Sequence, residues 1–268
     1  MIGQQVALPM YLGAPDAVQT LWSVLHQALA LEGLRALPDA AAWPQDLHLH
    51  WLSPDLLLSQ TCGYPLTHAL QGRVQLLGCF RYAAPGCEGI FCRSVFIARD
   101  EHAHLALGDF HARRVAFNSA DSQSGYNALR AMVAPLAQGG IFFGQTMETG
   151  SHRFSVDAVR EGRADLAAID CVTWALLQRH DAQATQGLCA IGHSAAYPGL
   201  PLITSLDTPP RQVQALRDGL HSLLKAPEAA GALTQLMISG FETPDLAVYQ
   251  RCVDMECSAM GSGYPHLA

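Results

Sequence analysis

A turn rich in serine and glycine has the residue types of an anion-binding site. Ser122, Ser124 and Gly125 stand between a short apolar run, typical of a buried strand, and an apolar stripe, typical of a helix. The first turn of a helix leaves amide N–H groups unpaired and carries partial positive charge, so hydroxyls placed there favour a bound phosphate, phosphonate or carboxylate. Serine is also a common helix N-cap, and this segment alone is equally consistent with an ordinary capped helix.

Two further segments add polar groups of the same kind. Ser151 and His152 follow Gly150 at the start of another expected helix, and two polar helix entrances in one small α/β unit can face each other across one site. Asp170 ends an apolar run over residues 166–169 that is typical of a buried strand. Open α/β sheets bind ligands at the carboxyl ends of their strands, although capping the next helix is the commoner role for a single acid.

Composition describes a globular chain and excludes several function classes. The 268 residues are 50% apolar, enough to form the core of one large domain or of two lobes. Lys and Arg total 16 against 23 Asp and Glu, so no basic stripe is available for nucleic acid. No apolar run reaches the length of about 18 residues that a membrane span needs. Strand and helix signals alternate along the chain, which favours a largely parallel sheet in each lobe.

Seven short segments together indicate a family. They are Leu8–Tyr11, Leu58–Pro65, Ala84–Cys87, Arg93–Ser94, Ser122–Gly125, Gly150–His152 and Ala167–Asp170. In this order they resemble the phosphate, phosphite and phosphonate substrate-binding proteins of ABC transporters, from Leu8 to Pro265. The resemblance implies an α/β chain with the bilobed type II periplasmic-binding-protein fold, in which two Rossmann-like lobes are joined by two hinge strands and close on a small anion. We expect lobe 1 to comprise residues 1–94 and 200–268, including the terminal helices, and lobe 2, with the anion-binding turns, residues 95–199.

The resemblance also implies which residues bind the ligand. The serine turn of the family would hold the phosphonate oxygens, and the Gly-Ser-His turn would assist it. Asp170 would accept a hydroxyl hydrogen or meet an amine of the ligand, and Arg93 would make either a bidentate contact or a hinge salt bridge. The expected ligand-binding residues are Tyr11, Gln60, Thr61, Arg93, Ser94, Ser122, Gln123, Ser124, Gly125, Ser151, His152 and Asp170. Relatives often carry Tyr shortly before the hinge Ser, where this chain has Phe91, Cys92 and Arg93.

The expected function is capture of phosphate, phosphite or a phosphonate in an interlobe cleft, for delivery to an ABC permease. We expect neither enzymatic turnover nor a cofactor. One alternative is a hydrolase that uses Ser151 or Ser124 with His152 and Asp170, which the lack of a Gly-x-Ser-x-Gly elbow disfavours. Another is a cytoplasmic ligand sensor of the same fold.

Location and cysteine chemistry each have two alternatives in the sequence. The family is typically periplasmic, yet Met1 lies close to the first expected strand, with no basic n-region or cleavage site. Either a leader has been removed or this member stays in the cytoplasm. We expect Cys62 and Cys87 to be neighbours, paired in an oxidising compartment and reduced otherwise. The eight cysteines contain no Cys-x-x-Cys pair, so we expect no metal site.

Overall fold

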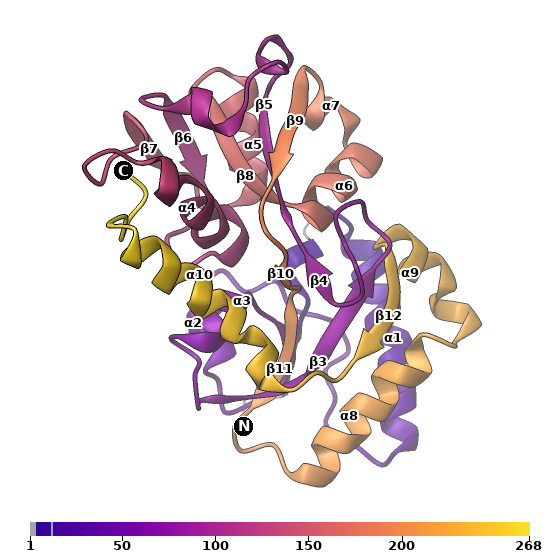
Figure 1. Cartoon of the computed structure of the whole chain (residues 1–268). Helices are drawn as coiled ribbons and strands as arrows, with labels where there is room; N and C mark the ends of the chain where they lie inside the picture. The colour runs from indigo at the N-terminus through magenta and orange to yellow at the C-terminus, as the bar shows by residue number, and fades with distance from the viewer. Residues whose placement is uncertain (1–3, 12) are drawn as a thin grey trace. The chain divides into compact units, whose positions relative to one another are not determined.

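The chain passes three times between two units, each of which contains a five-stranded sheet (Figure 1). This computed structural model describes residues 4–11 and 13–268. The first unit runs to Ala83 and resumes over Gly199–Val248. The second unit comprises Ala84–Pro198 and Tyr249–Ala268. Among the described residues, no helix is long and apolar enough to cross a membrane.

The first unit is built on a sheet with the strand order β1-β2-β11-β3-β12. Its strands are β1 (Gln5–Ala7), β2 (Leu56–Gln60), β3 (Val74–Tyr82), β11 (Pro201–Ser205) and β12 (Ile238–Glu242). Its helices are η1 (Pro9–Tyr11), α1 (Pro15–Leu31), α2 (Leu47–Trp51), α3 (Gly63–Thr67), α8 (Pro210–Leu223), η6 (Pro227–Ala229) and α9 (Ala230–Gln235). Every residue of β2 is buried, as expected for a strand inside the sheet.

Helix α1 forms where its apolar periodicity predicts. Pro15 occupies the first turn, where its missing N–H costs no hydrogen bond, and Gly33 follows the helix with a φ of 86°. The apolar stripe faces the core, including Leu25 and Leu29. A Cβ on Gly219 of α8 would lie 2.9 Å from Leu25 and 3.0 Å from Leu29, so this glycine allows α1 and α8 to pack closely.

The second unit has the strand order β7-β6-β8-β5-β9 and a separate pair of short strands, β4 and β10. Its strands are β4 (Phe91–Cys92), β5 (Ser94–Arg99), β6 (Arg114–Phe117), β7 (Gln145–Glu148), β8 (Leu166–Asp170), β9 (Leu188–His193) and β10 (Tyr197–Pro198). Its helices are η2 (Asp100–His102), η3 (Leu107–Phe110), η4 (Gln123–Asn127), α4 (Ala128–Val133), η5 (Ala134–Leu136), α5 (His152–Arg160), α6 (Cys171–His180), α7 (Ala182–Thr185) and α10 (Gln250–Gly261). One more 3-10 turn, η7 (Leu246–Tyr249), spans the last passage between the units.

The sheets are mixed, so the prediction of a largely parallel sheet in each lobe is wrong. Among the described residues of the first unit, β1 and β2 alone pair in parallel, whereas β11 runs antiparallel to β2 and β3. In the second unit β6 is parallel to β7 and β8, but β5 is antiparallel to β8 and β9. Strand β11 enters its sheet after the chain has passed through the other unit, so no local β-α-β crossover fixes its direction.

The C-terminal segment belongs to the second unit, although we expected it to pack on the first lobe. The Arg130 side chain of α4 donates hydrogen bonds to the Pro265 carbonyl oxygen at 2.6 Å and to Glu256 at 3.1 Å. The Leu267 N–H donates to the Tyr126 hydroxyl at 3.1 Å. The apolar stripe of α10 predicts that the helix packs on a core, but a stripe does not identify which core. Residues 84–94, which we also expected in lobe 1, form a hairpin of the second unit.

Candidate functional site

The two polar helix entrances of the second unit meet at Ser124 and His152. The Ser124 Oγ lies 2.8 Å from the His152 Nε2 and 3.4 Å from the Ser122 Oγ. Ser122 is the N-cap residue, and its Oγ accepts a hydrogen bond of 3.0 Å from the Gly125 N–H. The capped turn, η4, is a π-helical turn that leads directly into α4, an irregularity that often accompanies functional sites.

Gly125 is required by the packing of the protein itself. A Cβ at this position would lie 1.9 Å from the Asn118 Oδ1 and 3.2 Å from the His152 Cε1. The same two side chains carry buried polar atoms with no partner among the described residues, Asn118 Oδ1 and His152 Nδ1. Buried polar groups nearly always have a hydrogen-bond partner, so these atoms mark a position at which a ligand or water is expected to bind.

His152 is held neutral by its surroundings. Burial lowers the pKa of its imidazole to about 4, because a charged ring would lose its hydration. The neighbouring Ser151 caps α5, its Oγ accepting from the Phe154 N–H at 3.2 Å. No acid orients the imidazole, since Nδ1 is unpaired among the described residues. The arrangement therefore lacks the third member of a Ser-His-Asp triad.

Ser94 and Asp170 are cross-strand neighbours in the pairing of β5 with β8. The Ser94 Oγ donates to the Ser124 carbonyl oxygen at 2.8 Å and lies 2.9 Å from the hydroxyl of Tyr197. Asp170 caps α6 by accepting from the Thr173 N–H at 2.9 Å. Burial, with a smaller contribution from the adjacent Cys171 sulfur, raises the pKa of Asp170 to about 7. Strand pairing thus connects the acid to the serine turn through Ser94.

The first unit contains its own buried polar cluster at the ends of β2 and β3. The Gln60 Nε2 donates to the hydroxyls of Tyr11 at 3.2 Å and Tyr82 at 3.0 Å, and the two hydroxyls are hydrogen bonded to each other. The Gln60 Oε1 and the Thr61 Oγ1 are buried without a partner among the described residues. These are again the polar atoms that a ligand would satisfy.

Two predicted residues have other contacts. Gln123 is buried, and its amide group bonds to Met255 at 3.2 Å and to Asn127 at 2.8 Å. Its side chain is thereby committed to packing α10 on η4. Arg93 is exposed and donates to the Ser194 carbonyl oxygen at 2.9 Å.

Three residues of these clusters were missed by the sequence analysis. Asn118 precedes the serine turn, Tyr82 ends β3 and Tyr197 lies in β10. An Asn immediately after a buried strand is a usable signal for the first of them. Tyr82 and Tyr197 reach their clusters through pairing between distant strands, which local spacing does not reveal.

Cys62 lies in the first unit and Cys87 in the second, and no disulfide joins them in this structure. Met1, on which the expectation about a leader depended, lies outside the described residues.

The chain matches a known protein family over most of its length. Residues 55–249 match the family described as the periplasmic substrate-binding protein of phosphonate ABC transporters. This is the family that the resemblance of the sequence indicated, and the match covers well over half of the chain. Among curated proteins, no sequence matches the chain.

Solved structures share the fold at low sequence identity. A binding-protein component of an ABC phosphonate transporter from Pseudomonas aeruginosa has a TM-score of 0.75 at 16% identity, over 97% of this chain and 88% of that one. PhnD1 from Prochlorococcus marinus, in complex with methylphosphonate, has a TM-score of 0.71 at 15% identity, over 90% and 93%. A protein from Xanthomonas citri bound to ATP has a TM-score of 0.69 at 16% identity, over 92% and 94%.

Proposed function

We propose how this chain, which belongs to the family of periplasmic substrate-binding proteins of phosphonate ABC transporters, holds its ligand. Membership confirms the predicted family, the periplasmic-binding-protein fold and the expectation of solute binding without enzymatic turnover. The ligand that we propose is a phosphate, phosphite or phosphonate anion. The proposed partner is the permease of an ABC transporter, and the proposed location is the periplasm.

The observation that carries the proposal is the hydrogen-bonded group formed by Ser94, Ser124 and His152. The entrances of two helices lie at this group. Ser122 and Ser151 each cap one N–H of their first turns, and the remaining first-turn N–H groups accompany the side-chain hydroxyls. Such neutral donors attract an oxyanion without a net positive charge on the protein. This explains how an acidic chain with a net charge of −7 binds an anion.

We assign the ligand-holding roles in the second unit to Ser124, Ser151 and His152, while Ser122 and Gly125 maintain the turn that presents Ser124. Ser124 donates its hydroxyl hydrogen to an anion oxygen, and neutral His152 supports it on the other side. Above its raised pKa of about 7, the ionised Asp170 accepts a hydrogen from a monoprotonated phosphonate or from an amine on the ligand, and it disfavours a fully ionised ligand by charge repulsion. This pairing gives the site selectivity for the protonation state of its ligand.

Tyr11, Gln60 and Thr61 supply the contribution of the first unit. The unpaired Gln60 Oε1 can only accept a hydrogen bond, so it suits a hydroxyl or amine hydrogen of the ligand. The Thr61 hydroxyl can donate to an anion oxygen. Ser94 contributes by fixing the Ser124 backbone. Arg93 and the side chain of Gln123 have the other contacts described above, and we give them no direct role.

Calorimetric titration of the purified chain tests this function. The panel contains methylphosphonate, phosphite, phosphate, 2-aminoethylphosphonate and ATP, with sulfate as a fully ionised control. We expect one phosphorus oxyanion per chain, and a gain in folding stability of about 2.7 kcal/mol when the ligand is present at about 100 times its dissociation constant. Absence of binding across the panel would contradict the proposal. So would steady hydrolysis of a phosphoester that disappears in Ser151→Ala, because this result would indicate the hydrolase instead.

A further inference from the structure

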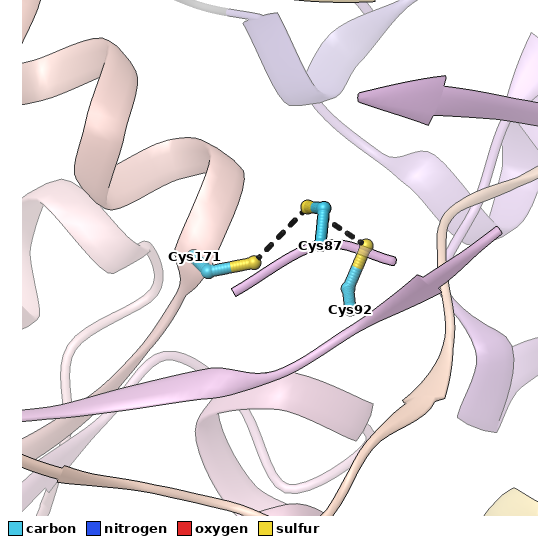
Figure 2. A group of neighbouring side chains, drawn as sticks. All are labelled: Cys87, Cys92 and Cys171. Carbon is cyan, nitrogen blue, oxygen red and sulfur yellow. Dashed lines mark hydrogen bonds between the residues drawn. The ribbon is translucent and has the colours of Figure 1, made fainter. Parts of the chain in front are cut away.

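Three cysteines of the second unit converge on one point (Figure 2). The Cys87 Sγ lies 3.4 Å from the Cys171 Sγ and 3.6 Å from the Cys92 Sγ, and all three sulfurs lie within 4.8 Å of one another. Cys92 and Cys171 are 3% and 1% exposed, while Cys87 is half-buried. Nothing in the anion-binding arrangement uses these thiols.

A tight hairpin brings the first two sulfurs together. Glu88 and Phe91 exchange two backbone hydrogen bonds of 2.9 Å inside the segment that separates Cys87 from Cys92. Gly89 takes a φ of 58° in the turn, a conformation that glycine adopts without strain. The four-residue spacing between the cysteines is therefore closed by regular hairpin geometry, although it lacks the Cys-x-x-Cys pattern.

The third sulfur is positioned by the start of α6. The Cys171 N–H donates to the Arg93 carbonyl oxygen at 3.1 Å, which ties the helix entrance to the strand after the hairpin. Gly86 has a φ of 92°, and a Cβ there would lie 3.2 Å from the Cys171 Cβ and 3.5 Å from its sulfur. A glycine at this position thus allows the hairpin to approach the helix closely. The backbone hydrogen bonds of the hairpin and the bond from the Cys171 N–H to Arg93 thus hold the three sulfurs together.

Two kinds of thiol chemistry require different distances between the sulfurs. A disulfide requires the sulfurs to be about 2.05 Å apart. Thiolates bound to one metal ion at about 2.3 Å, at trigonal or tetrahedral angles, lie about 3.8–4.0 Å from one another. The observed separations of 3.4 and 3.6 Å are those of thiols in hydrogen-bond contact, and they come within about 0.6 Å of the metal-bound value. A disulfide would also use two of the sulfurs and leave the third, whereas a metal ion uses all three.

We propose that Cys87, Cys92 and Cys171 form a binding site for one thiophilic d10 metal ion, with Cu(I) as the best fit. Soft sulfur ligands select Cu(I) and Zn(II) among biological metals. Structural Zn(II) almost always takes four ligands, and the described residues place three ligand atoms here, so Zn(II) would need a water as the fourth. Binding converts thiols to thiolates and releases their protons to solvent. The absence of a Cys-x-x-Cys pair led us to expect no metal site, whereas the three converging sulfurs of the folded cluster favour one. The metal site is independent of which anion the protein binds.

The experiment uses the full chain, reduced and then freed of reductant under anaerobic conditions. Cu(I) or Zn(II) is added, and native mass spectrometry gives the number of ions bound. X-ray absorption then counts the sulfur neighbours of the ion. We expect one Cu(I) per chain with three sulfur neighbours, and a competing chromophoric chelator gives its affinity. Zn(II) with three sulfurs and one oxygen supports the same site. Less than one ion per chain, or fewer than three sulfurs, would overturn the proposal.

Cys87→Ser is the principal variant, because this half-buried residue is the member of the cluster most easily replaced without unfolding the protein. It should weaken metal binding by more than about tenfold. Cys189→Ser and Cys257→Ser are matched controls outside the cluster and should leave binding unchanged. Equal affinity in Cys87→Ser and the controls would overturn the site. Peptide mapping of unreduced protein tests for a disulfide. A disulfide of Cys87 with Cys92 or Cys171 would overturn the metal site and indicate a redox pair instead.

Discussion

Ser124 and His152 are hydrogen bonded side chain to side chain, with the Oγ and the Nε2 2.8 Å apart, although 28 residues separate them. The bond joins the entrances of two helices into one structural unit. It also distinguishes Ser124 from Ser122, whose Oγ accepts the Gly125 N–H as a conventional cap. One serine thus faces the proposed anion group, and the other maintains the turn.

This division gives different expected outcomes for the two alanine variants. Ser124→Ala should weaken anion binding about tenfold to a hundredfold, because a hydrogen bond to a charged group contributes about 1.5–3 kcal/mol. Ser122→Ala should mainly lower the free energy of unfolding, by about 1 kcal/mol, through loss of the cap. Calorimetric titration and denaturant melts measure the two quantities on the same samples, with Ser23→Ala on an exposed face of α1 as a control. Unchanged affinity in the double variant would place the anion elsewhere.

The unpaired hydroxyl of Thr61 permits a sharper test in the first unit. Thr61→Val keeps the side-chain volume but removes a buried oxygen that has no partner among the described residues. The ligand-free protein should keep its stability or gain up to about 1 kcal/mol, since an unsatisfied buried polar group is costly. Affinity for the anion should fall by about tenfold if the hydroxyl donates to it.

The opposite pattern, lower stability with unchanged affinity, would show that the hydroxyl serves the fold alone. Thr67→Val is the matched control, because the Thr67 Oγ1 bonds to the Gly63 and Tyr64 carbonyl oxygens within α3.

Gly125 should not tolerate a side chain. The Cβ of Gly125→Ala would lie 1.9 Å from the Asn118 Oδ1, so Asn118 or the turn must move. We expect a loss of about 1–3 kcal/mol in the free energy of unfolding. Gly231→Ala in α9 is the control, because nothing lies within 4 Å of its added Cβ, and it should stabilise by up to about 1 kcal/mol. Equal stability of the two variants would mean that the turn adjusts freely.

Sequence patterns predicted the local elements of this fold better than its long-range partners. The apolar runs before Ser122 and up to Asp170 became β6 and β8, and the polar residues that follow each run became helix caps. These features depend on neighbours within a few residues. Which core receives α10 depends on contacts such as that of Arg130 with Pro265, which lie 135 residues apart.

Contacts between distant residues also limit how much of the candidate site can be predicted from the sequence. A motif identifies the serine turn, but the Tyr197 hydroxyl reaches Ser94 across 103 residues, and Cys171 reaches Cys87 across 84. No periodicity in the sequence records such pairs. The expectation of no metal site followed from a local spacing rule, and strand pairing together with a helix start brings the three sulfurs together regardless of that rule.

The stability of the protein should depend on pH through His152. His152 has a pKa of about 4 in the folded protein, below the ordinary value of 6.5, because burial disfavours the charged ring. As pH falls, the unfolded chain therefore takes up the proton first, and protonation favours unfolding. The contribution of His152 to stability is complete above about pH 6.5, declines as pH falls toward about 4, and declines no further below that. Since the residue is partly exposed, we expect the total loss to be about 1–3 kcal/mol.

The measurement is the difference in the free energy of unfolding between wild type and His152→Gln at intervals from about pH 7 to about pH 4. Asp170, with a raised pKa of about 7, has the opposite dependence in this range, because its folded carboxyl holds a proton that the unfolded one releases. Asp170 is present in both proteins, so its contribution cancels in the difference and that of His152 remains. The free energy of unfolding of the wild type should fall relative to that of His152→Gln as pH falls. A difference that stays constant across this range would mean that the imidazole is as well solvated in the folded protein as in the unfolded chain, and that His152 is not the neutral partner of Ser124.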